Sequence, residues 1–591
     1  MTLIAGMLSR NDRPLTDAGC ASLRQAISRH PADEVRAFRD RLSYFAKVDV
    51  EAFDEPGFYR DASGALSLLA GEPLLGTEDS SSSSKRIGGR LRDLTAIHEQ
   101  CLKSNWNVLR EAGGTFCVVH YQPRRGSLTL MADKLGIRPL YFWVDKDLIV
   151  FASTLRILEE FSLVPKKMDL RAVTEVVAFG APLADRTPYA GISLLKAAEI
   201  MQVTSEGTSR SCYWRWDEIE VANDPEPARL AIVHDCFQAA VSRRNRNDQA
   251  TVAYLSGGLD SRCTVAALRE RGTRVRTFNF AKPGTQDYAF GNQFAAKIAS
   301  EHASMPREEV GNTADFSSLM AIALGRSNHG QWPAERPRLV WSGEGGSVLL
   351  GHVHLSESQV ASMRAGNIDQ AIEDYMQREQ IDLPVKLFRP QILEHVRDVI
   401  RQGVKEELDQ LHADDAGRNL YLFLLHNDQR RKLMSHFENI DLHRLEFQLP
   451  FFDAGFLASV LATPLDRCLG HKFYVKWLSC FPPAVKTVPW QAYPGHEPCP
   501  LPVEDELGYQ WDEKFQARER MAQRRTLLAR ASKLLSAPDF PHEILSKRNL
   551  RLAAWAHLTG WRDYEYAIGA AQTYYEYWKN CNGKLAWPSV I

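Results

Sequence analysis

The chain has 591 residues, of which 44% are hydrophobic and 25% are charged, and its formal net charge is −1. These values are typical of a globular protein with two or more domains, and they exclude partners that are held by bulk charge, so we expect no nucleic-acid and no membrane partner. No apolar run approaches a membrane span, the first residues turn polar too soon for a signal peptide, and the ten cysteines contain no CxxC pair. We therefore expect a cytoplasmic protein with reduced thiols.

Short apolar strands separated by turns make up the first part of the chain. Leu3 to Leu8 predicts a buried first strand. Two further β-rich runs, 114–120 and 127–132, are separated by a short turn sequence around Pro123 to Gly126. This pattern predicts a hairpin within a mostly antiparallel domain.

A change of pattern near residue 221 marks a domain boundary. Residues 221–227 are polar and contain two prolines, and residues 228–244 then repeat apolar side chains at helical spacing. We place one domain at 1–220 and a second domain at 221–591.

The second domain opens with a strand, a glycine-rich turn and a helix. Thr251 to Leu255 predicts a buried strand, the sequence SGGLDS follows, and Thr264 to Leu268 predicts a helix. Glycines let the backbone approach an anion, and the helix start offers free N–H groups. An acidic side chain in such a turn suits Mg²⁺, so Asp260 is the candidate metal ligand. The residues expected to hold a phosphate group here are Leu255, Ser256, Gly257, Gly258, Leu259, Asp260 and Ser261. The structural alternative is a plain turn between a core strand and a helix.

Two more strands follow, alternating with helical segments. VRTFNF at 275–280 ends in Phe280, and residues 338–341 run into the loop Ser342-Gly343-Glu344. Alternating strands and helices predict an α/β domain with a doubly wound parallel sheet, whose ligand lies at the carboxyl ends of the strands. Phe280, Ser342 and Gly343 lie at these ends and therefore join the predicted ligand site. The tail from residue 511 onwards is predicted to be helical.

These motifs resemble one family in both parts of the chain. SGGLDS resembles the pyrophosphate loop of ATP pyrophosphatases, which activate a carboxylate as an acyl-adenylate. GTFCVVHY, ADKLGIRPLYFW and FAST, in that order from residue 114, resemble the glutaminase domain of asparagine synthetase. The resemblance implies an N-terminal-nucleophile sandwich of stacked sheets joined to an ATP-pyrophosphatase domain with a helical tail.

The chain departs from the family at its first catalytic position. Ala5-Gly6 stands where working members have Cys-Gly, and Ala70-Gly71-Glu72 stands where the family has Asn-Gly-Glu. Alanine has no nucleophilic atom. We predict a first domain that does not hydrolyse glutamine.

Three further family positions bear on the chemistry. The resemblance implies that Glu344 takes a proton from the attacking amine, although a solvated loop acid is the structural alternative. Ser347 replaces a family Asp that binds Mg²⁺, and Gln448 replaces a family Arg. Lys486 is the candidate for the lysine that steadies developing phosphate charge.

The implied function is ATP- and Mg²⁺-dependent amide formation that releases AMP and pyrophosphate. Relatives without the cysteine include lasso-peptide cyclases and β-lactam synthetases, so the leading hypothesis is a macrolactam cyclase that joins a peptide α-amine to an Asp or Glu side chain. Its partners would be a leader peptidase and a leader-binding protein. The alternatives are a ligase that amidates a small-molecule carboxylate with ammonia or another amine, and a non-catalytic scaffold.

Overall fold

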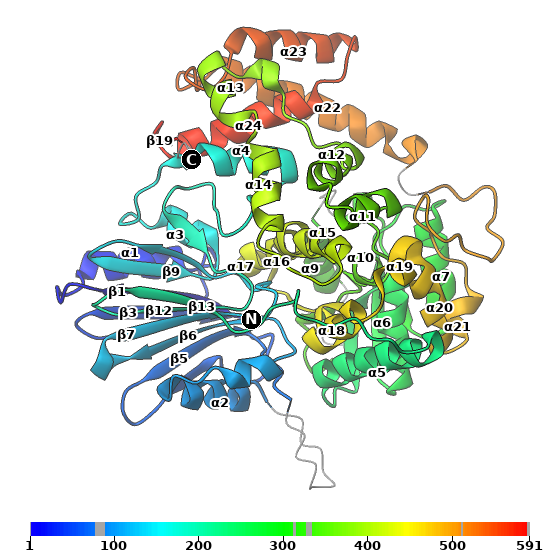
Figure 1. Cartoon of the computed structure of the whole chain (residues 1–591), viewed down its shortest axis with the longest axis horizontal. Coiled ribbons are helices and arrows are strands. Elements are labelled where there is room, and N and C mark those ends of the chain that lie inside the picture. Colours follow the sequence, from blue (N-terminus) through cyan, green and yellow to red (C-terminus); the bar gives the residue numbers. More distant parts are fainter. Residues whose placement is uncertain (1, 77–88, 311–314, 327–333, 510–511, 588–591) are drawn as a thin grey trace.

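The computed structural model describes residues 2–76, 89–310, 315–326, 334–509 and 512–587. Figure 1 shows two stacked sheets in the amino-terminal half, a second α/β body beside them, and a group of carboxyl-terminal helices at one end. Among the described residues, no helix combines the length and the hydrophobicity that crossing a membrane requires.

The amino-terminal half is a sandwich of two six-stranded antiparallel sheets. The first sheet has the order β11 (Ile192–Leu194), β8 (Tyr141–Val144), β9 (Leu148–Ala152), β1 (Thr2–Ser9), β3 (Ser43–Asp49), β2 (Arg36–Arg39). The second has the order β13 (Thr208–Cys212), β12 (Glu199–Val203), β7 (Ser127–Ala132), β6 (Phe116–Gln122), β5 (Leu66–Gly71), β4 (Phe58–Arg60). The stacked-sheet architecture implied by the resemblance is confirmed, as are the first strand and the β6–β7 hairpin.

Alternation along β1 decides which side chains fill the sandwich. Ile4 and Leu8 pack between the two sheets with Phe45 and Val119. Ala5 points the other way, because successive side chains of a strand leave on opposite faces, and it joins the core under the helices that cover the first sheet. Helices α1 (Asp17–Ala26) and α3 (Leu155–Glu160) lie on that face, and α2 (Arg90–Leu102) covers the second sheet.

The carboxyl-terminal half is built on a five-stranded parallel sheet. Its order is β16 (Glu301–Ser304), β15 (Arg274–Asn279), β14 (Ala250–Tyr254), β17 (Leu339–Trp341), β18 (Glu446–Gln448). The chain passes from β14 through α6 (Leu259–Glu270) to β15, and through α7 (Gln286–Lys297) to β16, before it returns to the other side of β14. The sheet is therefore doubly wound with a switch point between β14 and β17, which confirms the predicted class.

Further helices surround this sheet, beginning with α5 (Glu226–Asn245), as predicted after the proline-containing stretch. The others in this half are α8 (Arg307–Val310), α9 (Phe316–Arg326), α10 (Gly346–Leu349), α11 (Glu357–Arg364), α12 (Ile368–Arg378), α13 (Pro390–Val396), α14 (Val399–Leu408), α15 (Ala416–Leu424), α16 (Arg430–Glu438), α17 (Ile440–His443), α18 (Ala454–Leu461), α19 (Leu465–Cys468), α20 (Lys472–Trp477) and α21 (Ala484–Thr487). The predicted boundary at 220/221 falls between β13 and α5.

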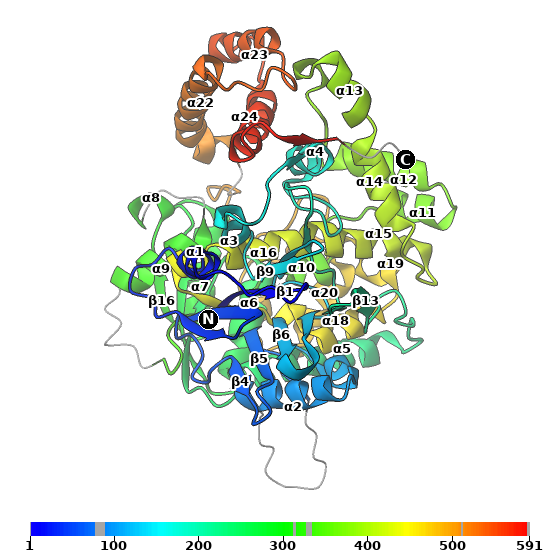
Figure 2. The same cartoon turned by 90° about the vertical axis from the view of Figure 1, so that its left-hand side faces the viewer.

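The tail helices pack on the amino-terminal half as well as on one another. α22 (Glu513–Ser536), α23 (Lys547–Thr559) and α24 (Glu565–Asn580) form one group that lies against α4 (Leu170–Phe179) in both views (Figures 1 and 2). β19 (Leu585–Ala586) pairs in parallel with β10 (Met168–Asp169). The tail is thus part of the fold that joins the two halves.

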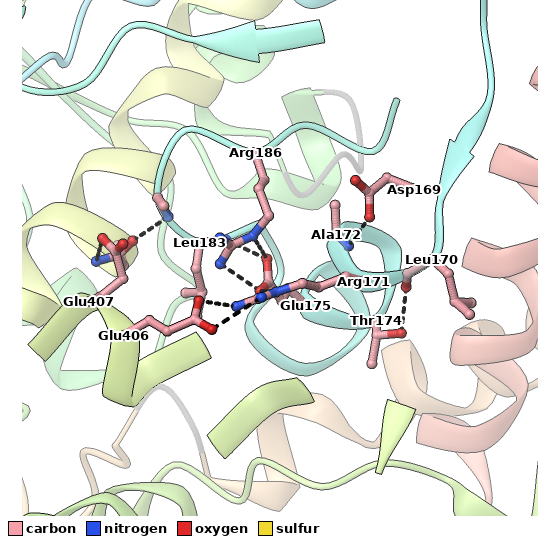
Figure 3. Close-up of polar contacts among 12 residues, drawn as sticks. Asp169, Leu170, Arg171, Ala172, Thr174, Glu175, Leu183, Arg186, Glu406 and Glu407 are labelled. Atoms are coloured by element: carbon pink, nitrogen blue, oxygen red, sulfur yellow. Dashed lines mark hydrogen bonds and ion pairs between the residues drawn. The ribbon is translucent and has the colours of Figure 1, made fainter. Parts of the chain in front are cut away.

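Buried ion pairs also hold the halves together. Arg138, from the amino-terminal half, forms a bidentate pair with Glu446 of β18 at 2.6 and 2.8 Å, and both side chains are almost fully buried. In a second contact, Arg171 of α4 reaches Glu406 of α14 (Figure 3). Breaking a buried pair leaves an uncompensated charge, so such contacts strongly favour one relative placement of the halves.

Candidate active site

The loop after β14 is held by short side chains and close backbone contacts. Ser256 N donates to Ser261 Oγ at 2.9 Å, and the two hydroxyl oxygens lie 3.0 Å apart. A Cβ at Gly257 would lie 2.7 Å from the Asp287 Cα, so only glycine fits without a backbone shift. No side chain caps the start of α6, which leaves its first N–H groups available to an anion.

The loop after β17 closes against this first loop. A Cβ at Gly343 would lie 2.3 Å from Ser261 N, and a Cβ at Gly346 would lie 2.6 Å from Asp260 Cγ. Ser347 donates from its N and its Oγ to the two carboxylate oxygens of Asp260, each at 2.8 Å. The two predicted loops therefore lie together at the switch point of the sheet, where open α/β sheets bind their ligands.

Asp260 is the predicted metal ligand, and its surroundings are compatible with that role. Tyr474 donates a third hydrogen bond to it, at 2.9 Å. Burial raises the pKa of Asp260, although the bonds from Ser347 and Tyr474 partly offset this rise. A carboxylate offers about four acceptor sites, so one remains, and Mg²⁺ in nucleotide sites is commonly held by one or two carboxylates plus phosphate oxygens. Ser347 supplies hydrogen bonds here in place of a second carboxylate.

Glu344 stands at the mouth of the second loop, beside a histidine. Its Oε2 accepts from His436 Nε2 at 2.8 Å, and Ser317 Oγ lies 3.2 Å from the other ring nitrogen of His436. The Glu344 side chain remains 46% exposed, which leaves it open to an incoming group. Burial alone would raise the pKa of Glu344, but the charge of His436 lowers it below its usual range. For the histidine, burial opposes the charged form, yet the Glu344 carboxylate raises the pKa of His436.

This pairing was not predicted from the sequence. Glu344 and His436 are 92 residues apart and come from a loop and from α16. The His436 ring packs at 4.7 Å from the Phe447 ring of β18. A lone histidine in a helical pattern carries no signal of such a contact, so only the fold could reveal it.

The structure does not bring Lys486 into this cluster. Lys486 is exposed on the short helix α21, and within the described ranges its side chain forms no hydrogen bond or ion pair. The segment around it is nevertheless fixed, because the buried Arg262 of α6 donates to the carbonyls of Val488 and Pro489, both at 2.7 Å. Sequence reasoning did not anticipate this role of Arg262.

The apolar members of the predicted nucleotide site are buried. Leu255 is 1% exposed, Leu259 is 7% exposed and Phe280 is 6% exposed. The Phe280 ring lies at the end of β15, 6.3 Å from the Tyr254 ring. These buried side chains pack beneath the loops at the carboxyl ends of the strands. Leu255 and Leu259 could therefore contact a ligand only through their backbone groups.

The position that would hold a nucleophile in the amino-terminal half is closed. Ala5 is fully buried in the middle of β1, with Ala46 and Ala152 as its cross-strand partners. Glu72 is also buried, and its carboxylate is taken by Arg246 and by Gln448 Nε2, the latter at 3.0 Å. Both partners come from the carboxyl-terminal half, so the Glu72 carboxylate joins the two halves.

Comparisons with known proteins find a match in each half of the chain. A family model described as a glutamine amidotransferase domain matches residues 96–214, and one described as asparagine synthase matches residues 233–322. The chain is 23% identical over 228 residues to asparagine synthetase [glutamine-hydrolyzing] 3 of Bacillus subtilis, covering 37% of this chain and 36% of that protein. It is 24% identical over 191 residues to the putative asparagine synthetase [glutamine-hydrolyzing] 2 of Methanocaldococcus jannaschii, covering 31% of this chain and 37% of that protein.

The matches span just over a third of the length of these relatives. Among solved structures, glutamine phosphoribosylpyrophosphate amidotransferase from B. subtilis covers 56% of this chain and 98% of its own, at 12% identity and a TM-score of 0.24, which is too low to support an argument. The chain is thus similar to a glutamine amidotransferase domain in its amino-terminal half and to asparagine synthase in its carboxyl-terminal half.

Proposed function

We propose that the protein forms amide bonds by activating a carboxylate with ATP. The observation that carries this proposal is the meeting of the Ser256–Ser261 loop and the Ser342–Ser347 loop at the switch point of a parallel sheet. Glycines, serine hydroxyls and a helix start provide a cradle for phosphate, and a carboxylate stands at its mouth.

The first step uses the phosphate cradle. A substrate carboxylate oxygen attacks the α-phosphorus of ATP, the bond to pyrophosphate breaks, and an acyl-adenylate forms. The Ser256 and Ser261 hydroxyls and the backbone N–H groups at the start of α6 would hold the departing pyrophosphate, and Asp260 would hold Mg²⁺. When bound, Mg²⁺ would neutralise part of the phosphate charge.

The second step uses Glu344. An amine attacks the acyl carbon, the bond to AMP breaks, and the proton that the amine loses passes to Glu344. The charge of His436 lowers the pKa of Glu344, which keeps this carboxylate ionised and able to accept a proton. Lys486, on the exposed helix α21, remains the candidate for the lysine that would steady developing phosphate charge.

The source of the amine is the finer part of the proposal. The printed names of the relatives describe glutamine hydrolysis, but Ala5 offers no nucleophile. A substrate that brings its own amine meets this condition, and a macrolactam cyclase that closes a peptide α-amine onto an Asp or Glu side chain, served by a leader peptidase and a leader-binding protein, is our leading version. Amidation of a small acid with free ammonia or another amine is supported equally well by the comparisons.

The deciding experiment is pyrophosphate release from ATP and Mg²⁺. Purified protein is given ammonia with aspartate, glutamine with aspartate, or a candidate precursor peptide with its peptidase, and Asp260→Asn serves as the inactive control. Release only with peptide, with a product lighter by one water, is expected for the cyclase. Release with ammonia would favour the small-molecule ligase, and ATP binding without any release would favour a non-catalytic scaffold.

A further inference from the structure

Helix α16 carries His436, and its first turn is held by the amino-terminal half. Arg430 Nε donates to Gly136 O at 2.9 Å, and Arg431 Nη2 donates to Ala184 O at 2.7 Å. Both side chains are buried, and neither forms an ion pair with a carboxylate in the part of the chain that the structure describes. A buried guanidinium is costly unless its N–H groups are satisfied, so these contacts strongly favour one position of the helix.

The other end of α16 is held by the same half. Glu438, its last residue, accepts from Tyr141 OH at 2.6 Å and from Leu155 N at 3.0 Å. Three residues later, Asp441 accepts from Arg29 and Arg156 at 2.6 and 2.9 Å. All four donors belong to the amino-terminal half, so the helix is gripped on both sides of His436.

Apolar packing does not explain the position of this helix by itself. A cavity of about 320 Å³ borders one side of α16. It is lined by Met434 and Ser435 on the helix and by Tyr141 and Val176 opposite. The helix buries Leu433, Met434 and Phe437 in the core, so the polar contacts at its two ends add to apolar packing in fixing where His436 lies.

The segment before α16 is held by the loop that contains Ala184. Residues Leu425–Gln429 form a π-helix, a rare geometry that is frequent at functional sites. Within it, Asn427 Oδ1 accepts from Ala184 N at 2.8 Å, so both backbone polar groups of Ala184 bind this long helix. Glu175 braces the loop by accepting from Leu183 N and from the Arg186 guanidinium (Figure 3).

We propose that the amino-terminal half, which has no nucleophile, serves as the positioning device for His436. It holds α16 at both ends so that the imidazole meets the Glu344 carboxylate at 2.8 Å. Tyr141, Glu438 and Arg431 are positioning residues in this scheme. The catalytic consequence rests on the function proposed above, in which Glu344 takes the proton of the amine.

The test removes one hydroxyl group that binds the end of α16. Tyr141→Phe deletes the donor to Glu438, and Tyr213→Phe is the matched control, because Tyr213 is equally buried but donates to Ala132 O within the amino-terminal half. Hydrogen–deuterium exchange at the His436 ring carbon, followed by mass spectrometry across pH, measures the pKa of His436 in each protein. We expect the pKa to fall by roughly half a unit or more in Tyr141→Phe, because the ring loses its fixed contact with Glu344, and to stay unchanged in Tyr213→Phe.

A kinetic readout separates positioning from folding. In Tyr141→Phe we expect amide formation to fall about 10-fold, with carboxylate-dependent ATP–pyrophosphate exchange retained. The acid limb of the rate profile should move to higher pH, because Glu344 loses the charge that lowers its pKa. Glu438→Ala removes the acceptors for both Tyr141 OH and Leu155 N and should behave like Tyr141→Phe.

The outcomes distinguish the two proposals. Equal His436 pKa values in Tyr141→Phe and Tyr213→Phe would overturn the positioning role, whatever the activity. If the wild-type protein releases no pyrophosphate with any substrate, the proposed function fails, while the pKa comparison still decides whether the amino-terminal half positions His436.

Discussion

The two halves of this chain contain two potential active sites, and only one keeps the groups that chemistry requires. In the carboxyl-terminal half, the Ser256–Ser261 loop, Asp260 and Glu344 lie together at the strand ends. In the amino-terminal half, Ala5 is sealed in a strand and Glu72 is engaged by residues of the other half. The comparison teaches that the same kind of buried polar group can line a potential site in one half and join the two halves in the other.

The physical reason is that the two sites tolerate change differently. Ala5 fits β1 because an alternating strand needs only a small apolar side chain at that position. Gly257 and Gly343 have no such freedom, because a single added carbon would meet backbone atoms at 2.7 and 2.3 Å. The nucleophile of the first half was dispensable to the fold, whereas the loops of the second half are not.

The sharpest test of the comparison is Glu344→Gln. The amide side chain keeps the shape but cannot take a proton, so we expect amide formation to fall by roughly 10²- to 10⁴-fold while carboxylate-dependent pyrophosphate release persists. Glu357→Gln, at an exposed residue paired with Lys472, should change neither step. Equal loss of both steps in Glu344→Gln would assign this residue to binding instead.

A second test adds one methyl group at the junction of the two loops. Gly343→Ala should abolish most pyrophosphate release and lower stability by about 1–3 kcal/mol, because the new Cβ would overlap Ser261 N. Gly569→Ala, in helix α24 with open space around it, should instead stabilise the protein by about 0.5–1 kcal/mol. Thermal unfolding and pyrophosphate release measure both effects, and an active, stable Gly343→Ala protein would contradict the close approach of the loops.

The elements that form the two halves could largely be predicted from the sequence, because the signals for them are local. The strand, glycine turn and helix around SGGLDS follow from residues within one stretch, and the β6–β7 hairpin follows from its turn residues. The His436–Glu344 pair and the carbonyls that hold Arg430 come from segments far apart in the chain. Periodicity does not encode such contacts, since they depend on how distant segments pack against one another.

The third test concerns acid stability, to which two buried histidines of the amino-terminal half should contribute. His98 and His120 are buried there and share the hydroxyl of Ser67, each at 2.9 Å. Burial, and then the neighbouring His98, lower the pKa of His120 to about 3. In the unfolded chain it titrates near its ordinary value of about 6.5, so the unfolded state binds more protons below that pH. The contribution of His120 to stability should therefore be complete above about pH 6.5 and be lost as pH drops toward 3.

Substitution of His120 should weaken this pH dependence. We expect His120→Gln to be less stable than wild type at pH 8 but to lose less stability between pH 8 and pH 5, as measured by urea unfolding. His542→Gln, at an exposed position in the tail, should leave the difference between the two pH values unchanged. An unaltered slope in His120→Gln would mean that other groups govern the acid response.

The smallest expected effect is that of Ala5→Cys, which restores the nucleophilic atom without its surroundings. The position is fully buried between Ala46 and Ala152, so the thiol would lie in the core beneath the helices. Burial raises the pKa of Cys117, in the facing sheet, to about 12, and the same cause would keep a thiol at position 5 protonated and unreactive. We expect no glutamate release from glutamine and no maleimide labelling at residue 5, whereas the exposed Cys212 should label in the same sample. Glutamate release by Ala5→Cys would show that the first half lacks only the nucleophilic sulfur; its absence would agree with a site that is closed by its surroundings as well.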